Sequence, residues 1–91
     1  MMKEVLSKYL KKKIVLDTSS TWIYIGILEK VFESSVLLSD VDVHDNTDSN
    51  STKECYVLDS KKTGIKFNRH KAYINLDYIV SFSALDDVKF F

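Results

Sequence analysis

Residues 21–31 read TWIYIGILEKV, a run of β-branched and aromatic residues that contains a single glycine, Gly26. Such a run is typical of a strand, and a glycine inside it indicates a sharp bend or a close approach of two backbones. The residues from Trp22 to Ile25 are all bulky, so they occupy both faces of the strand. A strand that is apolar on both faces is covered on both faces. We therefore expect a long, bent strand with core on one side and a helix or a neighbouring subunit on the other.

Polar turn signals divide the rest of the chain into further elements. We predict strands at residues 13–17, 21–31, 35–43, 53–58 and 72–82, separated by turns at 18–20, 33–34, 45–52 and 61–64. Apolar residues at 5, 6, 9 and 10 recur at helical spacing and predict an amphipathic helix over residues 1–12. The expected architecture is one mainly β domain over residues 1–91.

Composition limits the classes of function. The 91 residues carry 13 Lys plus Arg against 13 Asp plus Glu, so the formal net charge is zero, which excludes a uniformly basic nucleic-acid binder. A chain this small has a thin core, and its one cysteine, Cys55, cannot form an intrachain disulfide, so we expect self-association to supplement stability. The sequence lacks a signal peptide and a membrane-spanning run, and we expect a soluble, cytoplasmic protein.

Two stretches resemble the sequence motifs of the Sm-like (LSm) family. The first motif is matched by IYIGIL at 23–28, a tight turn at 32–35 and VLLSD at 36–40, and the second by YINLDYIVSF at 73–82. The resemblance spans nearly the whole chain, apart from an enlarged segment before the last strand. It implies a divergent bacterial or archaeal member with a short N-terminal helix, a strongly bent five-stranded SH3-like barrel, and an enlarged hairpin or loop at residues 44–71.

The resemblance is weakest where RNA-binding family members hold a uridine. Those members carry an Asp and an Asn in the first-motif turn and an Arg-Gly pair in the second motif, whereas this chain has FESS at 32–35 and Asn75-Leu76. The usual pocket is therefore not encoded. Phe32 remains as a residue that could stack on a base, and Ser34, Ser35 and Asn75 remain as hydrogen-bonding residues. Stacking of a base on an aromatic ring is worth about 1–3 kcal/mol.

Two basic clusters are present although the net charge of the chain is zero. The first is Lys11 to Lys13, with Lys3 and Lys8 on the predicted helix; the second runs from Ser60 to Lys71 without an acid. Its candidate RNA-binding residues are Lys61, Lys62, Lys66, Phe67, Arg69 and Lys71. Basic residues interleaved with aromatic ones suit a surface that tracks single-stranded RNA. The alternatives are a hairpin that lysines keep soluble, or a patch that meets the acidic residues 40–48 of another subunit.

The resemblance also implies assembly into a ring. In Sm-like rings the last strand of one subunit pairs with the fourth strand of the next, so we expect a homo-oligomer of about five to seven subunits. The predicted interface residues are Tyr56, Val57 and Leu58 on the fourth strand, and Ile79, Val80 and Phe82 on the last strand.

Metal binding and catalysis have little support. The acids at 40, 42, 45 and 48 around His44 could hold a cation, but they lack the glycine and the bidentate acid of an EF-hand loop. A small hydrolase would have to pair Cys55 with His44 or His70, and Cys55 is better explained as a small buried hydrophobe. We expect no catalytic residues, no metal and no cofactor.

The sequence favours a non-enzymatic Sm-like ring protein that binds single-stranded RNA through basic and aromatic residues. The alternative is a protein–protein interaction or scaffold module that keeps the ring but has lost the nucleotide pocket.

Overall fold

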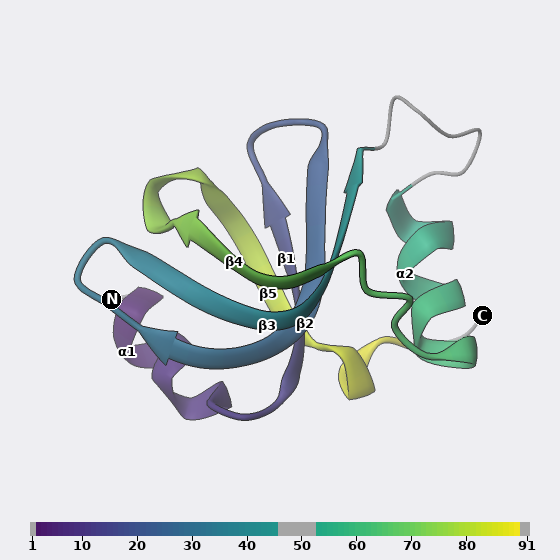
Figure 1. Cartoon of the computed structure of the whole chain (residues 1–91), viewed down its shortest axis with the longest axis horizontal. Coiled ribbons are helices and arrows are strands. Elements are labelled where there is room, and N and C mark those ends of the chain that lie inside the picture. The colour runs from purple at the N-terminus through teal and green to yellow at the C-terminus, as the bar shows by residue number, and fades with distance from the viewer. Residues whose placement is uncertain (1, 46–52, 90–91) are drawn as a thin grey trace.

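The computed structural model describes residues 2–45 and 53–89. Its centre is one antiparallel five-stranded sheet with the strand order β4-β3-β2-β1-β5, which Figure 1 shows to be strongly curved. The strands are β1 (Lys13–Thr18), β2 (Trp22–Val31), β3 (Ser35–Asp45), β4 (Arg69–Asn75) and β5 (Ile79–Ala84). Within the described ranges β4 and β5 do not pair with each other, so each is an open edge of the sheet. The predicted mainly β class, with a helix before five strands, is confirmed.

The helices are short. They are α1 (Met2–Leu6), the 3-10 helix η1 (Ser7–Tyr9), α2 (Lys53–Thr63), and the 3-10 helices η3 (Leu76–Tyr78) and η4 (Leu85–Asp87). The N-terminal helix is shorter than the predicted 1–12, because the α-helical part ends at Leu6 and continues as a 3-10 turn, a common way for a helix to end. No helix in the described part of the chain has the length and hydropathy of a membrane span.

Gly26 marks a close approach of two backbones, as predicted. A Cβ atom at this position would lie 3.0 Å from the carbonyl oxygen of Ser39 and 3.3 Å from the Cα of Val41, both on β3. The register of the β2–β3 pair shifts at this point, and Asp40 on β3 adopts a left-handed conformation with φ of 47°. A β-bulge with such a residue bends the strand, which explains the curvature of the sheet here.

Apolar side chains form one cluster on each face of the sheet. The inner cluster lies on the concave side under α1 and contains Leu6, Ile14, Leu16, Leu28, Val36, Leu38, Val41, Ile74 and Ile79. The outer cluster lies on the other face under α2 and contains Val15, Ile23, Ile25, Val57 and Leu85. The expectation that β2 is covered on both faces is confirmed, and the outer cover is a helix of the same chain (Figure 1).

The predicted strand at residues 53–58 is wrong, because these residues begin helix α2. Val57 and Ser60, three positions apart, are buried, while Asp59 and Lys62 are exposed, which is a helical pattern. Gly64 has φ of 94° and donates its amide to the carbonyl of Ser60 at 2.9 Å, which ends the helix. A four-residue apolar run such as 55–58 fits a buried strand and a helix turn equally well.

Two expectations that depended on this strand fail with it. Cys55 is exposed on α2, so its predicted burial is wrong. Tyr56, Val57 and Leu58 do not lie on the fourth strand, so the reason for placing them at a subunit interface is removed. Val57 instead packs against the outer face of β1 and β2.

The predicted last strand at 72–82 is two strands. The break begins at Asn75, whose side-chain oxygen accepts the amide of Asp77 at 2.9 Å and so stabilises a turn. Arg69 to Lys71, expected in the enlarged loop, are the first half of β4. In β5, Ile79 is buried and Val80 is exposed, so the described residues cover one face of this strand and leave Val80 uncovered on the other.

Candidate nucleic-acid interface

Two turns far apart in the sequence meet at one side of the molecule. The β2–β3 turn closes with a hydrogen bond from the amide of Phe32 to the carbonyl of Ser35 at 2.8 Å. The amide of Leu76, in the β4–β5 turn, donates to the carbonyl of Ser34 at 2.9 Å, and Ser35 is paired with Asn75 in the sheet. Figure 1 shows both turns on the left of the sheet. The structure therefore brings together all four residues that the motif resemblance selected: Phe32, Ser34, Ser35 and Asn75.

Aromatic rings surround this meeting point. The rings of Phe32 and Tyr73 lie 6.2 Å apart between centroids and are tilted by 33°. Phe32 is 40% exposed, Tyr73 66% and Tyr78 59%. We call Phe32, Ser34, Tyr73, Asn75 and Tyr78 the turn face. Its exposed rings can stack on flat ligands such as nucleobases.

Tyr73 and Tyr78 also line a cavity of about 390 Å³ beside the turn face. Its other residues are Thr18, Ser20, Tyr24, Ile74 and Asn75. The β1–β2 turn is held against it, because Ser19 donates its amide to the carbonyl of Tyr78 at 2.8 Å and Thr18 Oγ1 donates to the carbonyl of Trp22 at 2.7 Å. These hydrogen bonds hold the β1–β2 turn in place at the border of the cavity.

A second cavity, of about 380 Å³, continues along β4 toward its N-terminal end. It shares Tyr24 and Tyr73 with the first and adds Trp22, Val43, Arg69, Lys71 and Ala72. Two cationic side chains therefore lie next to three aromatic ones. A surface that binds single-stranded nucleic acid uses this combination, with cationic groups for the phosphates and aromatic rings for the bases.

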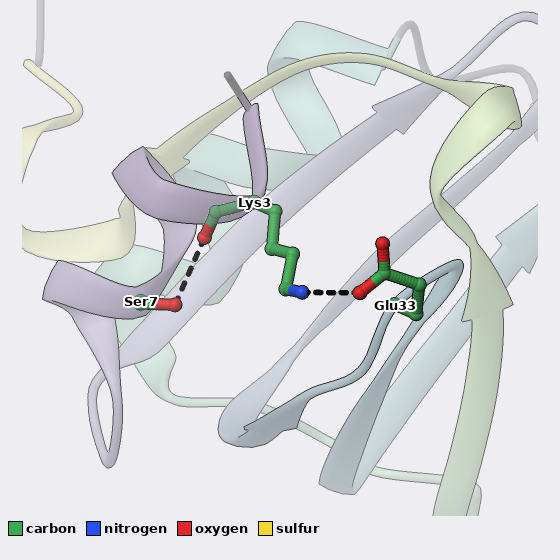
Figure 2. A network of polar contacts seen from close by, with 3 residues as sticks. All are labelled: Lys3, Ser7 and Glu33. Carbon is green, nitrogen blue, oxygen red and sulfur yellow. Dashed lines mark hydrogen bonds and ion pairs between the residues drawn. The ribbon is translucent and has the colours of Figure 1, made fainter.

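Helix α1 supports the turn face from the side. Lys3 Nζ contacts Glu33 Oε2 at 2.6 Å, and Ser7 Oγ donates to the carbonyl of Lys3 at 2.9 Å (Figure 2). The Lys3 ammonium holds the pKa of the Glu33 carboxyl below its ordinary value. The ion pair joins α1 to the β2–β3 turn next to Phe32.

Some polar groups of the turn face already form hydrogen bonds within the two turns. Asn75 uses its side-chain oxygen for the amide of Asp77, which leaves its amide nitrogen to face a ligand. Ser34 uses its carbonyl for Leu76. The turn face can therefore donate from Asn75 and accept on hydroxyl groups, and it presents no guanidinium where the Arg-Gly pair of the second motif would stand.

The basic segment predicted from the sequence is divided by the structure. Lys61 Nζ donates to the carbonyl of Asp86, at 2.9 Å, and to the carbonyl of Val88. These bonds join α2 to the segment that follows β5. Lys62 and Lys66 are exposed on α2 and after it, and Phe67 lies 6.3 Å from the ring of His70. Arg69 and Lys71 line a cavity together with Tyr73 of the turn face.

The sequence analysis did not select Trp22, Tyr24, Tyr73 or Tyr78 as candidate site residues. An exposed aromatic residue in a strand has the same sequence signature as a buried one, so periodicity could not find them. The Asn-x-Asp signature at 75–77 could have located the turn beside them.

The candidate metal ligands around His44 are not assembled in the described part of the chain. Within residues 2–45 and 53–89 no three His, Cys, Asp or Glu side chains gather as a metal would need, and Asp48 lies outside the described residues. The ring of His44 stacks on Tyr56 with centroids 4.0 Å apart, whereas the ring of His70 lies beside Phe67. Burial, with the Asp42 carboxylate adding to it, raises the pKa of the Tyr56 hydroxyl, which makes it a poor general base.

The fold matches solved structures of an Sm protein and of a chain of the NatC complex. The Sm protein of Pyrococcus abyssii, solved in complex with a uridine heptamer, superposes with a TM-score of 0.60 and 16% identity over 89% of this chain and 93% of that one. A chain of the NatC complex, solved bound to CoA, superposes with a TM-score of 0.58 and 12% identity over 92% of this chain and 94% of that one. No family sequence profile and no curated protein sequence matches the chain. The protein therefore has the Sm-like fold, established by structure and not by sequence identity.

Proposed function

We propose that this protein is a non-enzymatic subunit of a homo-oligomeric Sm-like ring and that it binds single-stranded RNA on the turn face. The observation that carries the proposal is the meeting of the two turns, which gathers the exposed rings of Phe32, Tyr73 and Tyr78 around Asn75. The solved structure with a similar fold that contains a uridine heptamer adds support.

Binding would be an equilibrium process in which bases and phosphates contact different residues. Bases stack on Phe32 and Tyr73, and Asn75 bonds a base edge. Arg69 and Lys71, which line the adjoining cavity, take phosphates. Phosphate contacts release counterions, so affinity falls as salt rises.

The proposed ring uses the two open edges of the sheet. The β5 edge of one subunit would pair with the β4 edge of the next, which satisfies backbone groups that an isolated subunit leaves unpaired. Val80 is 61% exposed on β5 and is the interface residue with most to bury, whereas Ile79 and Phe82 already contribute to the inner cluster. In a ring each turn face is repeated around the axis, which raises avidity for a long strand.

The test is a pair of aromatic variants matched in exposure. Phe32→Ala removes a ring from the turn face, and Phe67→Ala removes a ring of similar exposure, 51%, between α2 and β4. We expect Phe32→Ala to weaken binding of labelled U-rich or A-rich oligonucleotides about 5- to 100-fold in fluorescence anisotropy, the loss of one stacked base. Phe67→Ala should bind like the parent protein if the turn face alone stacks bases. Equal losses in the two variants, or binding that is indifferent to salt, would contradict the proposal.

A second candidate function is a protein-interaction or scaffold module. It is favoured by Asn75-Leu76 at the Arg-Gly position and by the similarity to a chain of the NatC complex. The experiment that separates the two candidates is purification without nuclease, followed by absorbance at 260 and 280 nm and by light scattering. An oligomer that carries nucleic acid supports RNA binding; an oligomer free of nucleic acid favours the scaffold; a 10.5 kDa monomer removes the ring.

A further inference from the structure

A cavity of about 860 Å³ lies outside the turn face. Its lining residues come from α1, η1, the segment after η1, the start of β1, the end of β5 and η4. Its volume is within the range of small-molecule sites, roughly 300–1,000 Å³. The floor is apolar and comes from Val5, Tyr9 and Ala84.

One wall of this cavity is basic. It consists of Lys8, Lys11, Lys12 and Lys13. The backbone that carries the last three is held in place, because Lys11 donates its amide to the carbonyl of Leu28 at 2.7 Å and Leu28 donates back to the carbonyl of Lys12 at 3.0 Å. Lys11 has φ of 67°, a left-handed conformation that is unfavourable for a residue with a Cβ and that such hydrogen bonds must maintain.

The four ammonium groups are not equally available. Lys11 forms an ion pair with Glu29, and Lys12 lies 5.8 Å above the centroid of the Tyr9 ring. Tyr9 is itself fixed edge-on against Phe82, with 5.5 Å between centroids. Lys8 and Lys13 are exposed and make no hydrogen bond or ion pair with the described residues. Two of the lysines that line the cavity therefore carry ammonium groups, with three donors each, that are not engaged by the described residues.

A second wall of the cavity is acidic. Asp86 and Asp87 belong to η4 and line the same cavity, and no ion pair among the described residues joins their carboxylates to the lysines. The basic and the acidic side chains of the lining are therefore not paired with each other. A ligand that fits must be anionic at one end and must donate hydrogen bonds at the other.

We propose that this cavity binds a small phosphate ester with hydroxyl or amino donors, for which a nucleoside monophosphate is the representative. The phosphate lies against Lys8 and Lys13, the aromatic or apolar part lies on Tyr9 and Val5, and the donors reach Asp86 and Asp87. The acidic wall is the reason to choose a small ester over an RNA strand. A strand running through the cavity would bring its next phosphate toward two carboxylates, which repel it.

The test is calorimetric titration of the full chain with AMP, adenosine and inorganic phosphate. We expect AMP to bind, phosphate to bind more weakly, and adenosine to bind least. The double variant Lys8→Gln/Lys13→Gln should weaken AMP about tenfold or more, the loss expected when hydrogen bonds to a charged group are removed. Lys62→Gln is the matched control, because Lys62 is exposed on α2 and is not among the residues that line the cavity. The affinity of this variant for AMP should equal that of the parent protein.

The acidic wall has its own test. Asp86→Asn/Asp87→Asn should weaken AMP but leave inorganic phosphate unchanged or slightly tighter, because phosphate has no donors for these carboxylates. Absence of AMP binding, or equal affinity in the Lys8→Gln/Lys13→Gln variant, would overturn the proposal. Displacement of AMP by a short oligonucleotide that loses affinity in this double variant would assign the lysines to RNA and overturn the small-ligand proposal. None of these outcomes depends on Phe32, so the site is tested separately from the turn face.

Discussion

The inner cluster takes side chains from α1 and all five strands, whereas the outer cluster takes them from β1 and β2 together with α2 and η4. Both consist of aliphatic residues with little exposure. Their difference lies in how many elements each one joins. The inner cluster holds together the whole curved sheet, and the outer cluster attaches one additional helix to two strands. We therefore expect the fold to depend on the inner cluster more than on the outer one.

The largest expected effect is on the inner cluster. Leu38 is fully buried in the centre of β3, so Leu38→Ala leaves a cavity that neighbours from several strands cannot fill. We expect a loss of about 2–5 kcal/mol in the free energy of unfolding. Urea denaturation followed by circular dichroism measures it. Val80→Ala, at an exposed position of β5, is the control and should change the stability of the monomeric state little.

A smaller effect is expected at the outer cluster. Val57→Ala removes two methyl groups buried between α2 and the sheet, at a cost of about 1.5–2.5 kcal/mol. The loss should be local: amides of α2 should exchange with solvent faster in the variant while amides of β2 and β3 keep their protection. If β2 and β3 lose protection equally, the two clusters unfold as one unit, and the distinction between them is wrong.

The hydrogen bonds of Lys61, near the C-terminal end of α2, should contribute less to the free energy of unfolding than the outer cluster does. Lys61 Nζ donates to two carbonyls of the segment after β5. Lys61→Met keeps the aliphatic stem and removes these bonds, for an expected loss of about 1 kcal/mol. Lys62→Met, one residue along on an exposed position, should be neutral. Equal thermal denaturation midpoints of the two variants would show that the bonds do not hold α2.

The smallest effect concerns pH. Hydrogen bonds from Lys11 and from Ser39, the latter at 2.5 Å, hold the pKa of the Glu29 carboxyl below its ordinary value of 4.5. A lowered folded-state pKa contributes stability above pH 4.5, and this contribution is lost as pH falls through the lowered value. Glu29→Gln should therefore be slightly less stable than the parent protein at pH 7 and should approach it under more acidic conditions. Urea midpoints at several pH values measure this. A difference that is constant with pH would show that the carboxylate charge contributes nothing.

The two clusters also differ in how far the sequence revealed them. The bend at Gly26 and the cover on both faces of β2 were predicted from TWIYIGILEKV, because a strand with bulky residues at four successive positions has no solvent-facing side. The element that supplies the outer cover was not predicted. Residues 55–58 have no helical or strand period long enough to distinguish the two, and their conformation follows from packing on β1 and β2.

The candidate site was predicted in part. The motif resemblance selected Phe32, Ser34, Ser35 and Asn75, and hydrogen bonds between two distant turns bring them together. The basic segment at 60–71 was expected to act as one patch. It is divided because Lys61 lies on a helix at one end and Lys71 on an edge strand at the other, and a charge run in sequence contains no information on such a change of direction.

Sequence alone was sufficient for what depends on neighbours along the chain: the long bent strand, the turn at Phe32, the neutral charge made of opposite clusters, and the mainly β class. Tertiary structure decided what depends on neighbours in space. It made residues 53–63 a helix, made Arg69–Asn75 the fourth strand, exposed Tyr73 and Tyr78 near Phe32, and brought four lysines and two aspartates into the lining of one cavity. The physical reason is that local conformational preferences are weak compared with the burial of an apolar face, so a short segment adopts the form that its packing partner requires.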